Sequence, residues 1–313
     1  MIIHIVGTRP NFIKCAELVK TIKRLYPEEK QHVVDTSQHF SPSMKESFLK
    51  GVGVASIPVM ERLIGSMTEY LSSVVGDGKI IVYGDCRSSL SGALVAYEKQ
   101  LPLYHVEAGL RCGNLLMLEE RARIAIDGMS NVNFCPSDRE NKNVSNGVVT
   151  GDIMYDIFLR ESKKTDTVGH DFFVFVTLHR KEILEKEKLC EILEKIKKRF
   201  KGYEIMMSLH PHTREILGRS TYPGINMFDP MNHQQTLSYI EHANFVVTDS
   251  GGVSKEAAWF KKKLYVVRDV SEWGLPTIGE DAHGLDEDPK DYKPLESGDG
   301  KASEKMAKSI IGG

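Results

Sequence analysis

Several kinds of protein are excluded by what this 313-residue sequence lacks. Its five cysteines are odd in number and scattered, and no two form a CxxC pair, so we expect reduced thiols, no disulfide framework and no structural zinc site. No apolar run approaches about 18 residues, and the amino terminus is apolar only as far as Val6. We therefore expect a cytoplasmic protein with neither a signal peptide nor a membrane-spanning helix.

An excess of either charge is also missing. The chain has 41 Lys and Arg residues against 43 Asp and Glu residues, a formal net charge of −2. Proteins that bind nucleic acid or an anionic membrane surface usually carry a basic excess, so we expect neither partner. The 41% hydrophobic and 27% charged residues are typical of a globular chain, and the length corresponds to two domains of about 150 residues.

Short β-branched runs alternate with amphipathic stretches along the chain, which predicts parallel strands joined by helices. The expected strands are Ile2–Val6, His32–Thr36, Ile80–Tyr83, Leu103–Val106, Val132–Cys135, Val148–Thr150, Phe172–Thr177, Glu204–Ser208, Asn226–Phe228, Phe245–Thr248 and Leu264–Val267. The expected helices are Pro10–Leu25, Ser43–Leu49, Ser88–Glu98, Glu119–Met129, Leu184–Phe200, Thr213–Leu217, Gln234–His242, Gly252–Trp259 and Ala302–Ile311.

A polar, lysine-bearing stretch at Glu161–Gly169 predicts a domain boundary. We therefore expect an α/β fold with a doubly wound, Rossmann-like domain over residues 1–160, a second over 170–297, and a final helix within 298–313. Ligands of open α/β sheets lie at the carboxyl ends of the strands, so two such domains facing each other imply a ligand-binding cleft.

Polar residues or glycines follow seven of the expected strands, at the positions where such a ligand would bind. The seven strand ends are Gly7–Pro10, Gly84–Asp85, Glu107–Arg111, His179–Arg180, His210–His212, Asp249–Gly252 and Arg268–Asp269. Each has an ordinary structural explanation as a turn, a solvated charge or, for Asp85 and Asp249, a helix cap. Their occurrence at seven strand ends together favours a functional site.

The segment that begins at Asp249 follows an apolar strand and precedes a helix. Backbone N–H groups at a helix amino terminus bind anions, and glycine permits a close approach, so Ser250, Gly251 and Gly252 predict a phosphate-binding turn. The alternative is a tight turn in which Asp249 or Ser250 caps the helix.

Two arginines could contribute to the same anion site. Arg9 and Arg268 follow the first strand of one half and the last strand of the other, and their guanidinium groups could bind a diphosphate or be exposed on the surface. The GxxxxGK[ST] and GxGxxG patterns are absent, so neither ATP hydrolysis nor NAD chemistry is supported.

Groups suited to acid–base catalysis occur in both halves. Asp85, Glu107 and Glu119 supply carboxylates in the first half, and His179 and His210 supply imidazoles in the second. Glu119 and its acidic neighbour could equally form the first turn of a helix, where negative charge is favourable. A second histidine follows His210 by two residues, but no third ligand stands at a recognised spacing, so no metal site is expected.

Seven motifs, in this order, resemble those of the UDP-N-acetylglucosamine 2-epimerase family of the non-hydrolysing type, a group with the GT-B fold. They are Gly7–Pro10 with Lys14, Thr36–His39, Gly84–Asp85, His105–Arg111, Glu119–Glu120 with Arg123, Thr177–Glu182, and Thr248–Gly252 with Glu256. The resemblance covers residues 2–273 and returns at residues 298–305.

The resemblance implies interconversion of UDP-N-acetylglucosamine and UDP-N-acetylmannosamine without a cofactor. The proton on carbon 2 of the sugar is only weakly acidic, so family members eliminate UDP across carbons 1 and 2 to give 2-acetamidoglucal. They then add UDP back with the proton delivered to the other face. Such a reaction needs a site that retains UDP and acid–base groups near both faces of the sugar.

The resemblance also implies roles for individual residues. Acid–base catalysis is assigned jointly to Asp85, Glu107, Glu119 and His179. The diphosphate contacts are Arg9, Ser250, Gly251, Gly252 and Arg268, the ribose contact is Glu256, and a further UDP contact is His210. Family members are often dimers, so a homodimer is expected, and their final helix crosses back to the first domain.

Some positions depart from the family pattern. Cys86, Leu118, Ala122, Gly128 and Gly274–Leu275 stand where the family usually has Thr, Pro, Asn, His and Pro-Glu. Ser41 replaces a glutamine with which bacterial members bind a second, allosteric UDP-sugar, so this sequence does not support allosteric activation.

Three other interpretations stay open. They are a hydrolysing relative that releases N-acetylmannosamine and UDP, a glycosyltransferase of the same fold, and a UDP-sugar-binding protein without catalytic activity. The hydrolysing branch commonly has Glu-Gly-Gly-Glu where this chain has Glu107-Ala108-Gly109-Leu110, which favours the non-hydrolysing epimerase.

Overall fold

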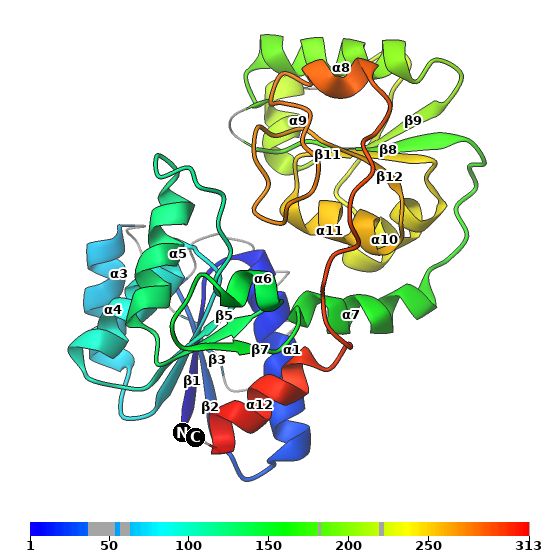
Figure 1. Ribbon diagram of the computed structural model, residues 1–313. Helices are drawn as coiled ribbons and strands as arrows, with labels where there is room; N and C mark the ends of the chain where they lie inside the picture. Colours follow the sequence, from blue (N-terminus) through cyan, green and yellow to red (C-terminus); the bar gives the residue numbers. More distant parts are fainter. Residues whose placement is uncertain (37–53, 57–62, 181–182, 219–221, 313) are drawn as a thin grey trace. The chain divides into compact units, whose positions relative to one another are not determined.

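The computed structural model describes residues 1–36, 54–56, 63–180, 183–218 and 222–312 (Figure 1). These residues form two compact units. The first comprises Met1–Ile157 together with Glu296–Gly313, and the second comprises Phe158–Leu295. The helix expected at residues 43–49 lies outside the described residues.

The first unit is built on a parallel sheet with seven strands in the described part of the chain. The strands are β1 (Ile2–Val6), β2 (Gln31–Asp35), β3 (Val54–Ser56), β4 (Lys79–Tyr83), β5 (Leu103–Val106), β6 (Val132–Cys135) and β7 (Gly147–Val149). Their order is β3-β2-β1-β4-β5-β6-β7. All five residues of β1 are buried, which explains why central strands of this sheet are almost continuously apolar.

Helices cover both faces of this sheet. They are α1 (Arg9–Leu25), α3 (Ile64–Val74), α4 (Arg87–Glu98), α5 (Leu118–Met129), α6 (Asp138–Asn141), the first part of α7 (Ile153–Glu161) and α12 (Ala302–Gly312). One hydrophobic cluster contains Leu18 of α1 and Met306 of α12. A second cluster contains Leu71 of α3 and Val95 of α4. The sheet is therefore buried between two helical layers.

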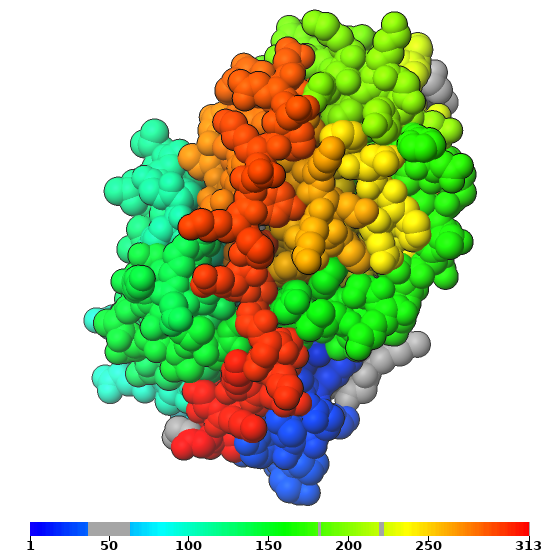
Figure 2. All heavy atoms as spheres, turned by 45° about the vertical axis from the view of Figure 1, so that its right-hand side comes forward, coloured from blue at the N-terminus to red at the C-terminus, as the bar shows by residue number. Residues whose placement is uncertain are grey.

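Helix α12 places the end of the described chain next to its beginning. It packs beside α1, as the red and blue segments of Figures 1 and 2 show. The Thr21 hydroxyl donates a hydrogen bond to Ser303 Oγ at 3.1 Å, across 282 sequence positions. Arg24 and Glu304 form an ion pair at 2.6 Å. The carboxyl-terminal helix is thus part of the first unit.

The second unit has a parallel sheet of five strands in the described residues, in the order β10-β9-β8-β11-β12. The strands are β8 (Phe173–Thr177), β9 (Glu204–Ser208), β10 (Asn226–Phe228), β11 (Phe245–Thr248) and β12 (Lys263–Val266). The helices are η1 (Ser162–Lys164), α8 (Lys186–Arg199), α9 (Pro211–Leu217), α10 (His233–His242), α11 (Gly251–Trp259) and η3 (His283–Asp286).

Successive residues of β8 face opposite sides of this second sheet. Val176 belongs to a cluster with Leu193 of α8 and Leu217 of α9. Phe175 contacts Tyr239 of α10 with ring centroids 5.7 Å apart. Helices therefore cover both faces, and the expected pair of doubly wound parallel sheets is confirmed.

The expected elements agree with the described structure to within two residues at either end. The sequence patterns miss the strand β3, the helices α3, α6 and α7, and the short helices η1 and η3. In α7 the apolar residues Ile153, Ile157 and Phe158 recur at helical spacing, but the helix is only nine residues long and runs into a polar stretch. The division between the two units falls within it, after Ile157.

Asp156 of α7 caps the amino terminus of α12. Its carboxylate accepts hydrogen bonds from the backbone N–H groups of Ala302 at 3.0 Å and Ser303 at 2.8 Å, and all three residues are buried.

Asp156→Ala leaves these donors unsatisfied, so the free energy of unfolding of the first unit should fall by about 1–3 kcal/mol. Urea denaturation measures the change. The control is Asp291→Ala at an exposed position, and equal stability of the two variants would contradict the capping role.

Candidate active site

Each sheet reverses its strand order at one point, and ligands of open α/β sheets bind beside such a point. The reversal lies between β1 and β4 in the first unit and between β8 and β11 in the second. Asp85 and Glu107 follow the neighbouring strands β4 and β5, and His179 follows β8. The structure therefore gathers predicted site residues at the carboxyl edge of each sheet.

Glu107 lies one residue beyond β5 in the left-handed region, with a φ of 72°. This conformation costs energy for a residue other than glycine, and in folded proteins it occurs often at functional sites. The Glu107 side chain is 13% exposed and forms an ion pair with the buried Lys14 of α1. Gly84 also has a positive φ, and a Cβ there would lie 3.4 Å from Glu107 Oε2. The Gly84 turn therefore leaves room for this carboxylate.

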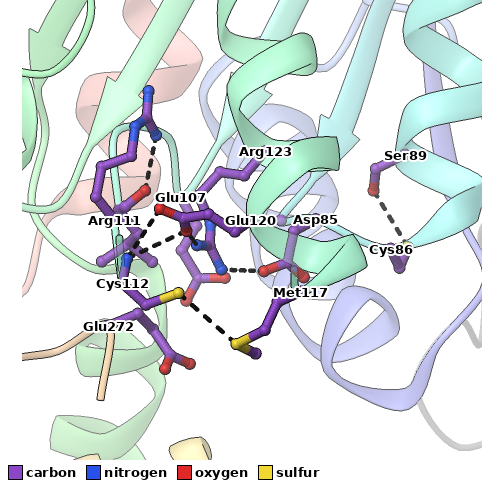
Figure 3. A network of polar contacts seen from close by, with 12 residues as sticks. Asp85, Cys86, Ser89, Glu107, Arg111, Cys112, Met117, Glu120, Arg123 and Glu272 are labelled. Carbon is purple, nitrogen blue, oxygen red and sulfur yellow. Dashed lines mark hydrogen bonds and ion pairs between the residues drawn. The ribbon is translucent and has the colours of Figure 1, made fainter. Parts of the chain in front are cut away.

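Arg123 of α5 joins two carboxylates (Figure 3). Its guanidinium pairs with Glu120 at 2.8 Å and with the partly exposed Asp85. Glu120 also accepts hydrogen bonds from the backbone N–H groups of Cys112 at 3.1 Å and Gly113 at 3.0 Å. Burial acts to raise the pKa of Glu120, but the backbone donors and Arg123 outweigh it and hold this pKa below its ordinary value. Glu120 thus anchors the loop before α5 as an ionised group.

Glu119, the adjacent residue, is exposed at the start of α5, whereas Glu120 is 1% exposed. An α-helix turns by about 100° per residue, so two adjacent side chains point in different directions. Of the two glutamates, only Glu119 has a side chain open to a ligand.

His179 is held in place by Asp249, the residue after β11. Asp249 is fully buried, and its Oδ2 accepts hydrogen bonds from the backbone N–H groups of His179 and Arg180, both at 2.7 Å. Its Oδ1 lies 3.2 Å from Nδ1 of His179. The His179 ring stacks on that of His210, with centroids 5.2 Å apart. An imidazole oriented by a buried carboxylate is suited to proton transfer.

The turn before α11 is capped by Ser250, as the alternative interpretation of this segment expects. Ser250 is the N-cap, and its hydroxyl accepts a hydrogen bond from the backbone three residues on, at 3.4 Å. Gly251 and Gly252 are the first helical residues. The buried Arg268 pairs with Glu272 at 2.9 Å, and a Cβ on Gly251 would lie 3.8 Å from its Nη1. A guanidinium and a helix amino terminus thus lie side by side.

The two remaining predicted nucleotide contacts differ in burial. Glu256 of α11 is buried and lies 2.7 Å from Nε2 of His233, so part of its hydrogen-bonding capacity is used within the second unit. Arg9, the first residue of α1, is exposed. Its guanidinium is therefore accessible at the carboxyl end of β1.

No group of three or more His, Cys, Asp or Glu side chains in the described part of the chain is arranged to hold a metal ion. The five cysteines are free thiols. Burial raises the pKa of both Cys86 and Cys112, the two near the carboxyl edge of the first sheet, which disfavours a nucleophilic thiolate there. Among the described helices, none combines the length and apolarity needed to cross a membrane.

Neither aspartate for which the sequence allows a helix-capping role is an N-cap. Cys86 stands at the N-cap of α4, and Asp85 pairs with Arg123. Ser250 caps α11, and Asp249 instead fastens the turn after β8. No local pattern reveals this role, because it depends on β8 and β11 being neighbours in the sheet. The ion pair of Arg123, in contrast, could have been found, since this residue follows Glu120 by three positions on one helix.

Comparison with known proteins identifies the family of this chain. The family model for UDP-N-acetylglucosamine 2-epimerase matches residues 23–276. The chain belongs to this family. A relative from Pseudomonas aeruginosa, UDP-2,3-diacetamido-2,3-dideoxy-D-glucuronate 2-epimerase, is 31% identical, and the match covers 87% of this chain and 84% of the relative. The UDP-N-acetylglucosamine 2-epimerase of Methanocaldococcus jannaschii is 28% identical and covers 86% of this chain and 83% of its own length.

Solved structures of this epimerase family share the fold. The M. jannaschii enzyme in complex with UDP-GlcNAc and UDP superposes with a TM-score of 0.85 at 24% identity, covering 100% of this chain and 99% of that one. The Neisseria meningitidis enzyme bound to UDP-GlcNAc gives a TM-score of 0.87 at 20% identity and covers 100% of both chains. The expected GT-B-like fold is confirmed.

The lowered pKa of Glu120 predicts a pH-dependent contribution to stability. Because the folded pKa lies below the ordinary value of 4.5, the ionised group stabilises the fold above pH 4.5, and this contribution is lost as the pH falls through the folded pKa. Glu120→Gln should therefore be less stable than the wild type at about pH 7, with a difference that shrinks in acid. Urea denaturation across the pH range measures this. The exposed Glu98→Gln is the control, and a deficit in Glu120→Gln that does not vary with pH would contradict the assignment.

Proposed function

We propose that this chain interconverts UDP-N-acetylglucosamine and UDP-N-acetylmannosamine by eliminating UDP to give 2-acetamidoglucal and adding it back. The observation that carries the proposal is the set of ionisable groups at the two carboxyl edges. Asp85, Glu107 and Glu119 place carboxylates in the first unit, and His179 adds an oriented imidazole in the second. Membership of the epimerase family supports this reaction type.

In this proposal the first unit moves the proton. Inversion at carbon 2 requires a base that removes the proton from one face and an acid that returns it to the other. The Glu107 carboxylate lies beside Lys14, and the Asp85 carboxylate lies beside Arg123. Each carboxylate therefore has a neighbouring cation that stabilises its negative charge after it releases a proton. We assign acid–base catalysis jointly to these carboxylates, Glu119 and His179.

The second unit, in the same proposal, holds the nucleotide. UDP must be retained after it leaves, because the same molecule is added back to the sugar. The Ser250 hydroxyl, the backbone N–H groups of Gly251 and Gly252, and the Arg268 guanidinium suit its diphosphate. The exposed Arg9 is assigned as a further cation. Glu256 is assigned to the ribose hydroxyl groups and His210 to a further UDP contact.

A second candidate substrate comes from the relative that is 31% identical. Its name specifies UDP-2,3-diacetamido-2,3-dideoxy-D-glucuronate, which undergoes the same change at carbon 2 of a sugar that bears a second acetamido group and a carboxylate. Both substrates therefore belong in the assay. We further propose that the chain acts as a cytoplasmic homodimer with no cofactor and no partner other than UDP-sugar and UDP.

The deciding experiment is incubation with each UDP-sugar in heavy water, followed by product analysis by NMR. The expected result is the UDP-linked 2-epimer with deuterium at carbon 2. Free N-acetylmannosamine and UDP would instead establish the hydrolysing reaction. Bound UDP without deuterium exchange would indicate a protein that binds UDP-sugar without catalysis, and sugar transfer to an acceptor would indicate a glycosyltransferase.

Glu107→Gln should lower epimerase turnover by about 10²–10⁴, the usual scale for one acid–base group. UDP affinity, measured by calorimetry, should stay close to that of the wild type because the proposed nucleotide contacts of the second unit are intact. The exposed Glu98→Gln is the matched control. A parallel loss of UDP binding in Glu107→Gln would be inconsistent with a catalytic role for this carboxylate.

Arg268→Ala should weaken UDP binding itself. Hydrogen bonds to charged groups contribute about 1.5–3 kcal/mol, so the dissociation constant for UDP should rise about 10–100-fold. Calorimetry with UDP measures this change. Arg214→Ala is the control, since the Arg214 side chain is 41% exposed and pairs with Asp229 at 3.3 Å. Wild-type UDP affinity in Arg268→Ala would rule out the diphosphate contact.

A further inference from the structure

Asp127 of α5 is a buried carboxylate to which the proposed reaction assigns no role. It is 6% exposed, and its oxygens face the side chains of His105 and Arg111. Oδ1 lies 2.8 Å from Nδ1 of His105, and Oδ2 accepts a hydrogen bond from Arg111 at 2.6 Å. Burial acts to raise the pKa of Asp127, but His105 and Arg111 outweigh it and hold this pKa below its ordinary value. The group is therefore an ionised carboxylate in the interior of the first unit.

His105 links Asp127 to the turn that carries Asp85. His105 lies in β5 and is fully buried, and its Nε2 is 3.0 Å from the carbonyl oxygen of Gly84. Both ring nitrogens of His105 therefore lie within hydrogen-bonding distance of an oxygen, Nδ1 of Asp127 and Nε2 of Gly84. The ring thus connects Asp127 to the residue directly before Asp85.

Gly109 links Asp127 to the turn that carries Glu107. The backbone N–H of Gly109, two residues further on, lies 3.3 Å from Oδ2 of Asp127. Gly109 has a φ of 79°, and a Cβ there would lie 2.3 Å from the carbonyl oxygen of Glu140, so only glycine fits this turn. The Asn143 side chain donates a hydrogen bond to the Gly109 carbonyl oxygen at 2.8 Å.

We propose that Asp127 is a positioning residue that sets the separation of the Asp85 and Glu107 carboxylates by fastening both of their turns, through His105 and Gly109. The inference rests on the proposed function, in which these two carboxylates act on one sugar carbon. A misplacement of about 1 Å can lower an enzyme's rate by about 10²-fold, so a single buried group that holds two turns has a direct effect on catalysis.

The test is Asp127→Asn, which keeps the size of the side chain but removes its charge and one acceptor. Turnover should fall by about 10²-fold while UDP affinity stays within about twofold of the wild type, since the proposed UDP contacts of the second unit are intact. In the proposed reaction, the elimination of UDP and the return of the proton to carbon 2 depend on acid–base groups at different positions. The ratio of released 2-acetamidoglucal to epimer should therefore rise, and a loss of stability alone would not change this ratio.

Asp156→Asn is the matched control, because Asp156 is also a buried aspartate of the first unit that accepts backbone hydrogen bonds, but at α12. It should lower stability and leave the product ratio at the wild-type value. The proposal is overturned if Asp127→Asn has wild-type turnover, or if its turnover falls only as far as that of Asp156→Asn with an unchanged product ratio.

Amide hydrogen exchange provides a readout that does not need activity. In Asp127→Asn, exchange at Gly109 and Asp85 should accelerate by about tenfold or more, whereas Asp156→Asn should leave it unchanged. Unchanged exchange in Asp127→Asn would overturn the proposal. If the wild type epimerises neither UDP-sugar, the proposed function fails, while the exchange result still shows whether Asp127 fastens the two turns.

Should Asp127→Asn not fold, Asn143→Ala replaces it. Asn143 is exposed, so its loss has little effect on folding, and it removes only the outer hydrogen bond to Gly109. The same rise in the product ratio and in exchange at Gly109 is expected, at smaller amplitude. Wild-type values for both quantities would count against the proposal.

Discussion

Ionised side chains at the end of a buried strand keep their place only where a cation or backbone N–H groups compensate for lost hydration. This constraint is met repeatedly in the structure, each time by a partner from another element. Lys14 of α1 pairs with Glu107 after β5, and Arg123 of α5 pairs with Asp85 after β4. Asp249, after β11, accepts two backbone N–H groups beyond β8. The positions of the polar groups therefore depend on the strand order of each sheet and on helix packing.

The two units share one architecture but differ in the polar groups that they carry. Both are parallel sheets covered by helices, and both place polar turns beside the reversal of strand order. The first unit collects carboxylates with their cations, and the second collects histidines and a glycine-rich helix terminus. Relatives similar to this chain have names that specify different sugars. A shared framework therefore does not by itself fix the sugar.

Much of this arrangement can be predicted from the sequence. Strands such as Leu103–Val106 and Val132–Cys135 match residue for residue, because short apolar runs between turn residues leave few alternatives. The polar residues predicted after the strands, among them Asp85, Glu107 and His179, do lie at the carboxyl edges of the two sheets. Which of Glu119 and Glu120 is buried depends on how α5 packs. The bonds of Asp127 depend on contacts between elements that are distant in sequence, so local patterns cannot supply them.

The inclusion of residues 296–313 in the first unit has a consequence for biosynthesis. This unit consists of two pieces of chain with the whole second unit inserted between them. On the ribosome, the second unit can complete its sheet while α12 is still untranslated, and the apolar side of α1 that α12 covers stays open until then. The nascent first unit therefore spends the translation time of more than a hundred residues incompletely closed, an interval in which a chaperone could bind it.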